Sequence, residues 1–269
     1  TIKENDAVLF FNLRSDRSRQ LTKAFVQPSF KEINQGAFTR AKHPNNIRFV
    51  ALTDFGPDLP NILTAFPSRD VQNGLVQTLC PRKQLYITES EKFAHVTYFL
   101  NGGYAQHFCD ENWMKIDSLD VKNYATKPGM SAGILGDYVS KALASGQYDF
   151  IAMNFANMDM VGHTGDFSAG QKAVTAVDTA IGKIIKSVLK NKCQAVITAD
   201  HGNIEEMINP ESGEPDTEHS VNPVPFILIN SFVRTPKKLP DGKLANVAPT
   251  ILKMMGIKQP AQMTAKSLV

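Results

Sequence analysis

The stretch at residues 195–203, AVITADHGN, places an aspartate, a histidine and a glycine directly after five small or β-branched residues. Such a run predicts a buried strand. In an open α/β sheet, ligands bind beyond the carboxyl ends of the strands. Asp200 and His201 would offer a hard oxygen and a borderline nitrogen, a pair suited to Mn²⁺ or Zn²⁺. Taken alone, the stretch is more typical of a strand-ending turn with a capping aspartate and a surface histidine.

Two further stretches change this interpretation. Residues 149–155 (DFIAMNF) predict a second buried strand, and the chain then reaches Asp159 and His163. These two are four residues apart, so one helical turn would bring both side chains to one metal ion. His219 lies just before a third strand-like run at residues 223–229 (PVPFILI). Because three of the six histidines lie at the edges of predicted strands, we expect a metal site at one edge of the sheet.

Three blocks of the sequence together resemble the cofactor-independent phosphoglycerate mutases of the alkaline phosphatase superfamily. They are residues 153–165 (MNFANMDMVGHTG), 198–203 (TADHGN) and 219–226 (HSVNPVPF). The block that contains Asp200 would alone indicate only the superfamily, whereas the combination points to this one family. The similarity covers essentially the whole chain. It implies a three-layer α/β/α sandwich of the alkaline phosphatase type.

The resemblance also implies an activity and a set of metal ligands. The family interconverts 2-phosphoglycerate and 3-phosphoglycerate in glycolysis and gluconeogenesis, through a phosphoserine and two Mn²⁺ ions. Asp159, His163 and His219 would be the protein ligands of one ion. Asp200 and His201 would be half of the ligands of the other. Zn²⁺, Co²⁺ or Mg²⁺ are the alternatives to Mn²⁺.

Arg14 and Arg17 follow a strand-like run at residues 6–13, where a strand would meet a helix. Guanidinium groups match the geometry of phosphate and carboxylate anions. The alternative is a basic, solvated helix face. The resemblance implies that both arginines bind the substrate from a transferase domain.

Lys92 follows a predicted strand at residues 84–88. At the end of a strand it could meet a phosphoryl group, and the alternative is a solvated lysine paired with Glu89 or Glu91. The resemblance implies a catalytic and substrate-binding lysine near the nucleophile.

Residues 56–70 contain three prolines and show no clear periodicity. We interpret them as a connection between domains. Residues 1–66 would be the C-terminal remnant of the transferase domain, a second α/β domain. Residues 67–269 would be the metal-binding phosphatase domain without its nucleophile segment.

The second predicted domain alternates strands with helices. Helical patterns at residues 131–145 and 168–189 separate strand-like runs, whereas residues 110–129 resemble a loop. Alternation of this kind predicts a βαβ-type sheet with helices on both faces.

Composition limits which kinds of partner and which cellular compartment we expect. With 42% apolar and 20% charged residues, the chain is an ordinary globular protein. A net charge of +3 is too small to argue for nucleic acid, and no apolar run approaches the roughly 18–20 residues of a membrane span. Cys80, Cys109 and Cys193 are far apart and suggest no disulfide, so we expect a reducing, cytoplasmic location. The resemblance, rather than composition, implies a small phosphorylated three-carbon acid as the partner and a monomer as the full-length protein.

Covalent phosphoryl transfer requires an activated nucleophile. In the resembled family this is a serine in an N-terminal segment, and no segment of this chain resembles it. We therefore expect the complete protein to be an enzyme and this chain alone to be inactive. One alternative is a metal-dependent phosphatase or phosphodiesterase of the same superfamily, which would need no clamp for glycerate. The other is a non-catalytic fragment.

Overall fold

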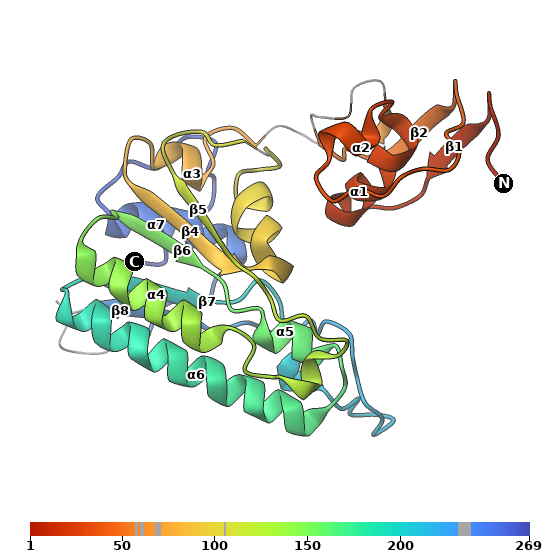
Figure 1. Cartoon of the computed structure of the whole chain (residues 1–269). Coiled ribbons are helices and arrows are strands. Elements are labelled where there is room, and N and C mark those ends of the chain that lie inside the picture. The colour runs from red at the N-terminus through yellow and green to blue at the C-terminus, as the bar shows by residue number, and fades with distance from the viewer. Residues whose placement is uncertain (57–58, 60–61, 68–70, 105, 231–237) are drawn as a thin grey trace. The chain divides into compact units, whose positions relative to one another are not determined.

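The chain divides into two compact units, each with its own sheet and hydrophobic core (Figure 1). The computed structural model describes residues 1–56, 59, 62–67, 71–104, 106–230 and 238–269. The first unit comprises Thr1–Gln72 and Gly102–Gln106, and the second comprises Asn73–Asn101 and His107–Val269. The division of the chain into a transferase remnant and a phosphatase domain remains a prediction.

The described residues of the first unit form a three-stranded parallel sheet with two helices. The sheet has the order β1 (Ala7–Phe10), β2 (Arg48–Thr53) and β3 (Leu63–Phe66), and the helices are α1 (Ser15–Val26) and α2 (Phe30–Ile33). Its core is apolar and aromatic, with Ala51 and Phe55 fully buried among neighbours that include Phe10. β3 corrects the prediction that residues 56–70 are only a connection. A four-residue strand is too short to show a hydrophobic period.

The central sheet of the second unit is parallel and is organised around a fully buried strand. That strand is β4 (Gln84–Glu89), which pairs with β5 (Asn112–Ile116) on one side and β6 (Phe150–Met153) on the other. The prediction of a loop at residues 110–129 was wrong at β5. As an edge strand of mixed polarity, NWMKI does not alternate apolar and polar residues.

A second, two-stranded sheet contains the strand that leads to Asp200 and His201. It is formed by β7 (Gln194–Thr198) and β8 (Phe226–Asn230), which run antiparallel. Among the described residues, β6 pairs only with β4, and β7 pairs only with β8. The predicted strands are therefore present, but in the described part of the chain they form two sheets. The prediction that the strands before Asp159 and Asp200 are buried was wrong, because no residue of β6 or β7 is fully buried.

Helices cover both faces of the central sheet, which confirms the three-layer α/β/α prediction. Leu85 and Ile87 pack on one face against α4 (Ala132–Ser145). Tyr86 lies on the other face with Val76 of α3 (Leu75–Thr78). The remaining helices are α5 (Asn157–Gly162), α6 (Phe167–Lys190) and α7 (Val247–Met254). Within the ranges that the structure describes, short helical turns lie at Ser90–Lys92, His95–Phe99, Tyr124–Thr126, Ile204–Glu206 and Leu244–Asn246.

One sequence prediction about the cysteines is wrong. Cys80 and Cys109 form a disulfide, with their Cα atoms 6.0 Å apart. A separation of 29 residues gave no sign of the pairing, because the two cysteines are brought together by folding. With this disulfide present, the cysteines no longer support a reducing compartment. No helix in the described ranges has the length and apolarity needed to cross a bilayer.

Candidate metal centre

Helix α5 holds the first two predicted ligands on one turn. The backbone amide of His163 donates to the carbonyl of Asp159 at 3.1 Å, as a helical turn requires. The same turn places Nε2 of His163 3.1 Å from Oδ1 of Asp159. The spacing of four residues therefore has the local structure that the sequence predicted.

His219 joins this pair from a loop that precedes β8. Its Nε2 lies 3.1 Å from Oδ1 of Asp159 and 3.1 Å from Nε2 of His163. One donor atom from each of the three residues lies within 4.8 Å of the others. One carboxylate oxygen and two imidazole nitrogens that face one another suit a divalent first-row metal ion.

The ring of His163 is oriented by a backbone carbonyl. Its Nδ1 lies 2.6 Å from the carbonyl oxygen of Thr217, which can only accept a hydrogen bond. In the neutral form of the ring, Nδ1 therefore carries the proton and Nε2 keeps its lone pair. Ligating histidines are commonly oriented in this way by a second hydrogen bond.

Asp200 and His201 lie beside this group, after β7. The ring of His201 stacks on that of His219, with centroids 3.7 Å apart and an interplanar angle of 21°. Nε2 of His201 lies 4.0 Å from Oδ1 of Asp159 and 3.4 Å from Oδ2 of Asp200. The structure thus brings all five predicted ligands into one cluster.

Lys92 lies at the end of the helical turn that follows β4. The residue is only 6% exposed, and its Nζ donates to Oδ2 of Asp159. The alternative of a solvated surface lysine is therefore wrong. Lys92 instead adds a positive charge at the edge of the candidate metal site.

The carboxylate of Asp159 stays ionised although it is largely buried. Burial raises its pKa, whereas the hydrogen bond and the charge of Lys92 lower it. With smaller contributions from His163 and His201, the pKa falls to about 2. At neutral pH, Asp159 is therefore an anion that can bind a metal ion.

Asn203 and Glu205 belong to the site but were not singled out from the sequence. Nδ2 of Asn203 donates to Oδ1 of Asp159 at 3.1 Å. The carboxylate of Glu205 accepts hydrogen bonds from the backbone amide of Asn203 at 2.8 Å and from the hydroxyl of Ser220. The loop of His201 and the loop of His219 are therefore tied together. The only sequence signal was the polarity of these residues next to Asp200.

Burial acts against the ionisation of Glu205, but its hydrogen bonds prevail. Desolvation raises the pKa of this carboxyl, whereas the hydrogen bonds from Ser220 and from the Asn203 amide lower it more. The net pKa lies below the usual value for a glutamate. The link between the two loops is therefore charge-assisted at neutral pH.

The two predicted substrate arginines belong to the first unit. Arg14 is the N-cap of α1, Arg17 lies in the first turn of that helix, and both are exposed. The structure confirms the strand-to-helix context that the sequence predicted. Their role in substrate binding remains a prediction.

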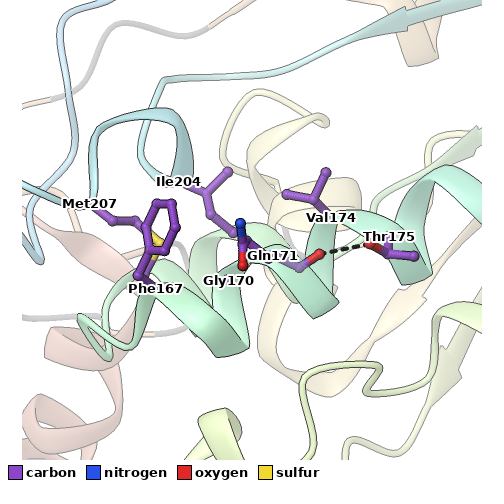
Figure 2. Close-up of a pocket in the computed structure, with 7 residues that line it drawn as sticks. All are labelled: Phe167, Gly170, Gln171, Val174, Thr175, Ile204 and Met207. Carbon is purple, nitrogen blue, oxygen red and sulfur yellow. Dashed lines mark hydrogen bonds between the residues drawn. The ribbon is translucent and has the colours of Figure 1, made fainter.

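A shallow apolar hollow of about 330 Å³ lies between α6 and the turn at Ile204–Glu206 (Figure 2). Phe167, Ile204 and Met207 line it together with Gly170 and neighbouring residues of α6. None of the predicted site residues lines this hollow. The hollow marks where the turn at Ile204–Glu206 packs against α6.

Family models match both parts of the chain. The model of the metalloenzyme superfamily matches residues 56–259, and that of the N-terminal part of BPG-independent phosphoglycerate mutases matches residues 1–57. The first of these matches covers well over half of the chain.

Individual relatives agree with the family models. A 2,3-bisphosphoglycerate-independent phosphoglycerate mutase of Methanosarcina barkeri is 47% identical over 100% of this chain and 50% of its own length. The corresponding protein of Moorella thermoacetica is 46% identical over 100% and 51%. The chain therefore spans about half the length of the curated relatives that it matches.

A solved structure supports the same conclusion. It is one of the crystal structures of Leishmania mexicana phosphoglycerate mutase at low cobalt concentration. The TM-score is 0.88 at 30% identity, over 100% of this chain and 51% of that one. The chain belongs to the metalloenzyme superfamily, and the relatives that it matches along its whole length are 2,3-bisphosphoglycerate-independent phosphoglycerate mutases.

Proposed function

We propose that the complete protein interconverts 2-phosphoglycerate and 3-phosphoglycerate, and that this chain supplies the metal-binding half of its active site. The observation that carries the proposal is the convergence of Asp159, His163 and His219 beside the buried Lys92. The similarity to named mutases over the whole chain supports the choice of reaction.

The donor set fits a divalent metal ion, for which we propose Mn²⁺. Asp159, His163 and His219 would hold one ion, and Asp200 and His201 would contribute to the site of a second. When bound, such ions activate a hydroxyl nucleophile and neutralise the charge of a phosphoryl group. Zn²⁺, Co²⁺ and Mg²⁺ are the alternatives that a metal titration would distinguish.

Lys92 would act on the phosphoryl group directly. Its ammonium group lies at Oδ2 of Asp159, beside the candidate ligands. A fixed positive charge in a largely buried site stabilises negative charge that develops in a transition state. We therefore assign Lys92 to the bridging or leaving oxygen of the transferred group.

Arg14 and Arg17 would hold the glycerate between the two transfer steps. Retention matters because loss of the glycerate would turn the mutase into a phosphatase. Guanidinium groups are suited to this task, since they bind carboxylate and phosphate with two parallel hydrogen bonds.

The phosphoryl-accepting serine would come from the part of the family that this chain does not cover. The resembled family carries it in an N-terminal segment, and no segment of residues 1–269 resembles that segment. We therefore expect this chain alone to have no mutase activity. As part of the proposal, we place the complete protein in the cytoplasm, where glycolytic substrates occur, as a monomer.

The second candidate function is a phosphatase or phosphodiesterase. It is favoured by one observation, namely that all five candidate metal ligands and Lys92 lie within the second unit. Such an enzyme would have no use for Arg14 and Arg17.

The two candidates differ in their products. The complete protein should be incubated with 3-phosphoglycerate and Mn²⁺, with 2-phosphoglycerate and inorganic phosphate measured together. A mutase forms the isomer and releases little phosphate. Arg14→Ala and Arg17→Ala should increase the fraction released as phosphate, whereas Arg19→Ala on the same helix should not. Release of phosphate without isomer by the wild type would reject the mutase in favour of the hydrolase.

A further inference from the structure

The carboxylate of Asp159 has to present one oxygen to two imidazoles at once. Oδ2 is held by Lys92, while Oδ1 lies 3.1 Å from Nε2 of His163 and 3.1 Å from Nε2 of His219. A carboxylate can rotate about its last bond, because that torsion is broad. The position of Oδ1 therefore depends on the donors that surround it.

We propose that Asn203 is a positioning residue that fixes this oxygen, and that Gly162 keeps the space which the Asn203 amide requires. The inference rests on the proposed metal site but not on the reaction that the site performs. Its basis is the hydrogen bond of 3.1 Å from Nδ2 of Asn203 to Oδ1 of Asp159. A carboxylate oxygen has two lone pairs, so it can accept this bond and still bind a metal ion.

The chemistry of the contact fixes which way the Asn203 amide points. If the amide were flipped, its Oδ1 would face the carboxylate, and two acceptors would repel each other. When Nδ2 of Asn203 donates to Asp159, the Oδ1 of the same amide is buried and has no hydrogen-bond partner among the described residues. A buried oxygen without a partner is unfavourable. The Asn203 amide is therefore kept, at a cost, in the position where it donates to a candidate metal ligand.

The backbone that carries this amide is held on two sides. The backbone amide of Asn203 donates to Oε2 of Glu205 at 2.8 Å. The next residue, Ile204, packs with Val161 of α5 and with α6, and Met207 lies against Gly170 of α6 (Figure 2). Asn203 itself is only 5% exposed. Its side chain therefore reaches Asp159 from a fixed position.

Gly162 provides the space for the Asn203 side chain. Gly162 lies on α5, the same helix as Asp159, and is buried. A Cβ at this position would overlap Oδ1 and Cγ of Asn203. Because Asn203 is only 5% exposed and has little room to give way, a methyl group here would displace its amide from Asp159.

Two substitutions therefore disturb the same hydrogen bond: Asn203→Ala removes its donor, and Gly162→Ala displaces it. Calorimetric titration of the 269-residue chain with Mn²⁺ tests this. Asn203→Ala and Gly162→Ala should each weaken Mn²⁺ binding by about 10-fold, the lower end of the range for partners of metal ligands. The double variant should bind no more weakly than Asn203→Ala, because the group that the new methyl displaces has been removed.

Asn157→Ala is the matched control. Asn157 is a fully buried asparagine of α5 whose Oδ1 also has no hydrogen-bond partner among the described residues, but its Nδ2 donates to the carbonyl of Pro128. This variant should unfold at a lower temperature and keep its Mn²⁺ affinity. Melting temperatures of all variants separate loss of folding from loss of positioning, and Asn203→Ser replaces Asn203→Ala if the latter does not fold.

Three results would overturn the inference. The first is wild-type affinity in a folded Asn203 variant. The second is a double variant whose loss of affinity is the sum of the two single losses, which would mean that Gly162 acts independently of Asn203. The third is a wild-type chain that binds no Mn²⁺. That result would reject the proposed metal site itself and is recognised without any variant.

Discussion

Lys92 and Asp159 form an ion pair between two largely buried side chains, 67 positions apart in the sequence. The exposed fractions of these side chains are 8% and 15%. Lys92 holds Oδ2 of the carboxylate, while Oδ1 faces the histidines. Asp159 therefore links the residue that we assign to the phosphoryl group with the residues that we assign to the metal.

Replacing Lys92 should have opposite effects on stability and on metal binding. Without metal, Lys92→Met should lower the free energy of unfolding by about 3–5 kcal/mol, because it leaves a buried carboxylate without its cation. The same variant should bind Mn²⁺ more tightly, since a positive charge near the metal site has been removed. Urea unfolding in a chelator and calorimetry with Mn²⁺ measure the two effects.

Lys115→Met is the control for this prediction. Lys115 pairs with Asp117 at 3.5 Å on the surface, where an ion pair contributes at most about 1 kcal/mol. If Lys92→Met were no less stable than Lys115→Met, the buried ion pair would not have the role that we give it.

Removing a histidine ligand should abolish Mn²⁺ binding at the first site. His163→Ala and His219→Ala each delete one of the three donor atoms that lie within 4.8 Å of one another. His43→Ala is the matched control, because its ring lies in the first unit and contacts the carbonyl of Phe25 at 2.8 Å. Calorimetry that finds the same affinity in all three variants would exclude these histidines as ligands.

Mn²⁺ affinity should fall on acidification, and the histidines should be the cause. With the pKa of Asp159 at about 2, its carboxylate remains charged between about pH 8 and about pH 5. Over this range only the imidazoles exchange the metal for a proton, since a histidine binds metal in its neutral form. Calorimetry at several pH values checks this, and an affinity independent of pH would show that no histidine is a ligand.

Glu89 should lower the stability of the fold as the pH rises. Its side chain is buried at the end of β4, and Oε1 accepts a hydrogen bond from the Ser131 amide at 3.0 Å. Burial raises the pKa of this carboxyl more than its hydrogen bonds lower it. Because the folded pKa exceeds the unfolded value of about 4.3, the protonated form favours the folded state. This contribution is complete below about pH 4.3 and is lost as the pH rises through the folded pKa.

Glu89→Gln removes that titration. Relative to wild type, this variant should gain free energy of unfolding as the pH is raised from about 4 to about 7. Exposed Glu211→Gln should show no such gain. Urea unfolding at a series of pH values measures both, and a constant difference between Glu89→Gln and wild type would contradict the assignment.

Local patterns predicted much of the fold and most of the residues in the candidate site. The strand before Asp200 follows from its small and β-branched residues, and the helical turn that joins Asp159 to His163 agrees with their spacing of four. β3 and β5 were missed because short strands without alternation carry no hydrophobic period.

Contacts between distant residues could not be predicted from local patterns. The Cys80–Cys109 disulfide and the hydrogen bond from Asn203 to Asp159 arise only when separate elements pack together. A single sequence contains the residue types for such contacts but no measure of their distance in space.

The most direct test of the account is a coupled assay of mutase activity with 3-phosphoglycerate and Mn²⁺. It should compare the 269-residue chain with a chain extended upstream by the N-terminal part of a family member. We predict activity in the extended protein, its loss in the extended His219→Ala variant, and no turnover by the 269-residue chain, which has no segment resembling the family's serine segment. Full turnover by the 269-residue chain, or undiminished turnover by the extended His219→Ala variant, would contradict the account.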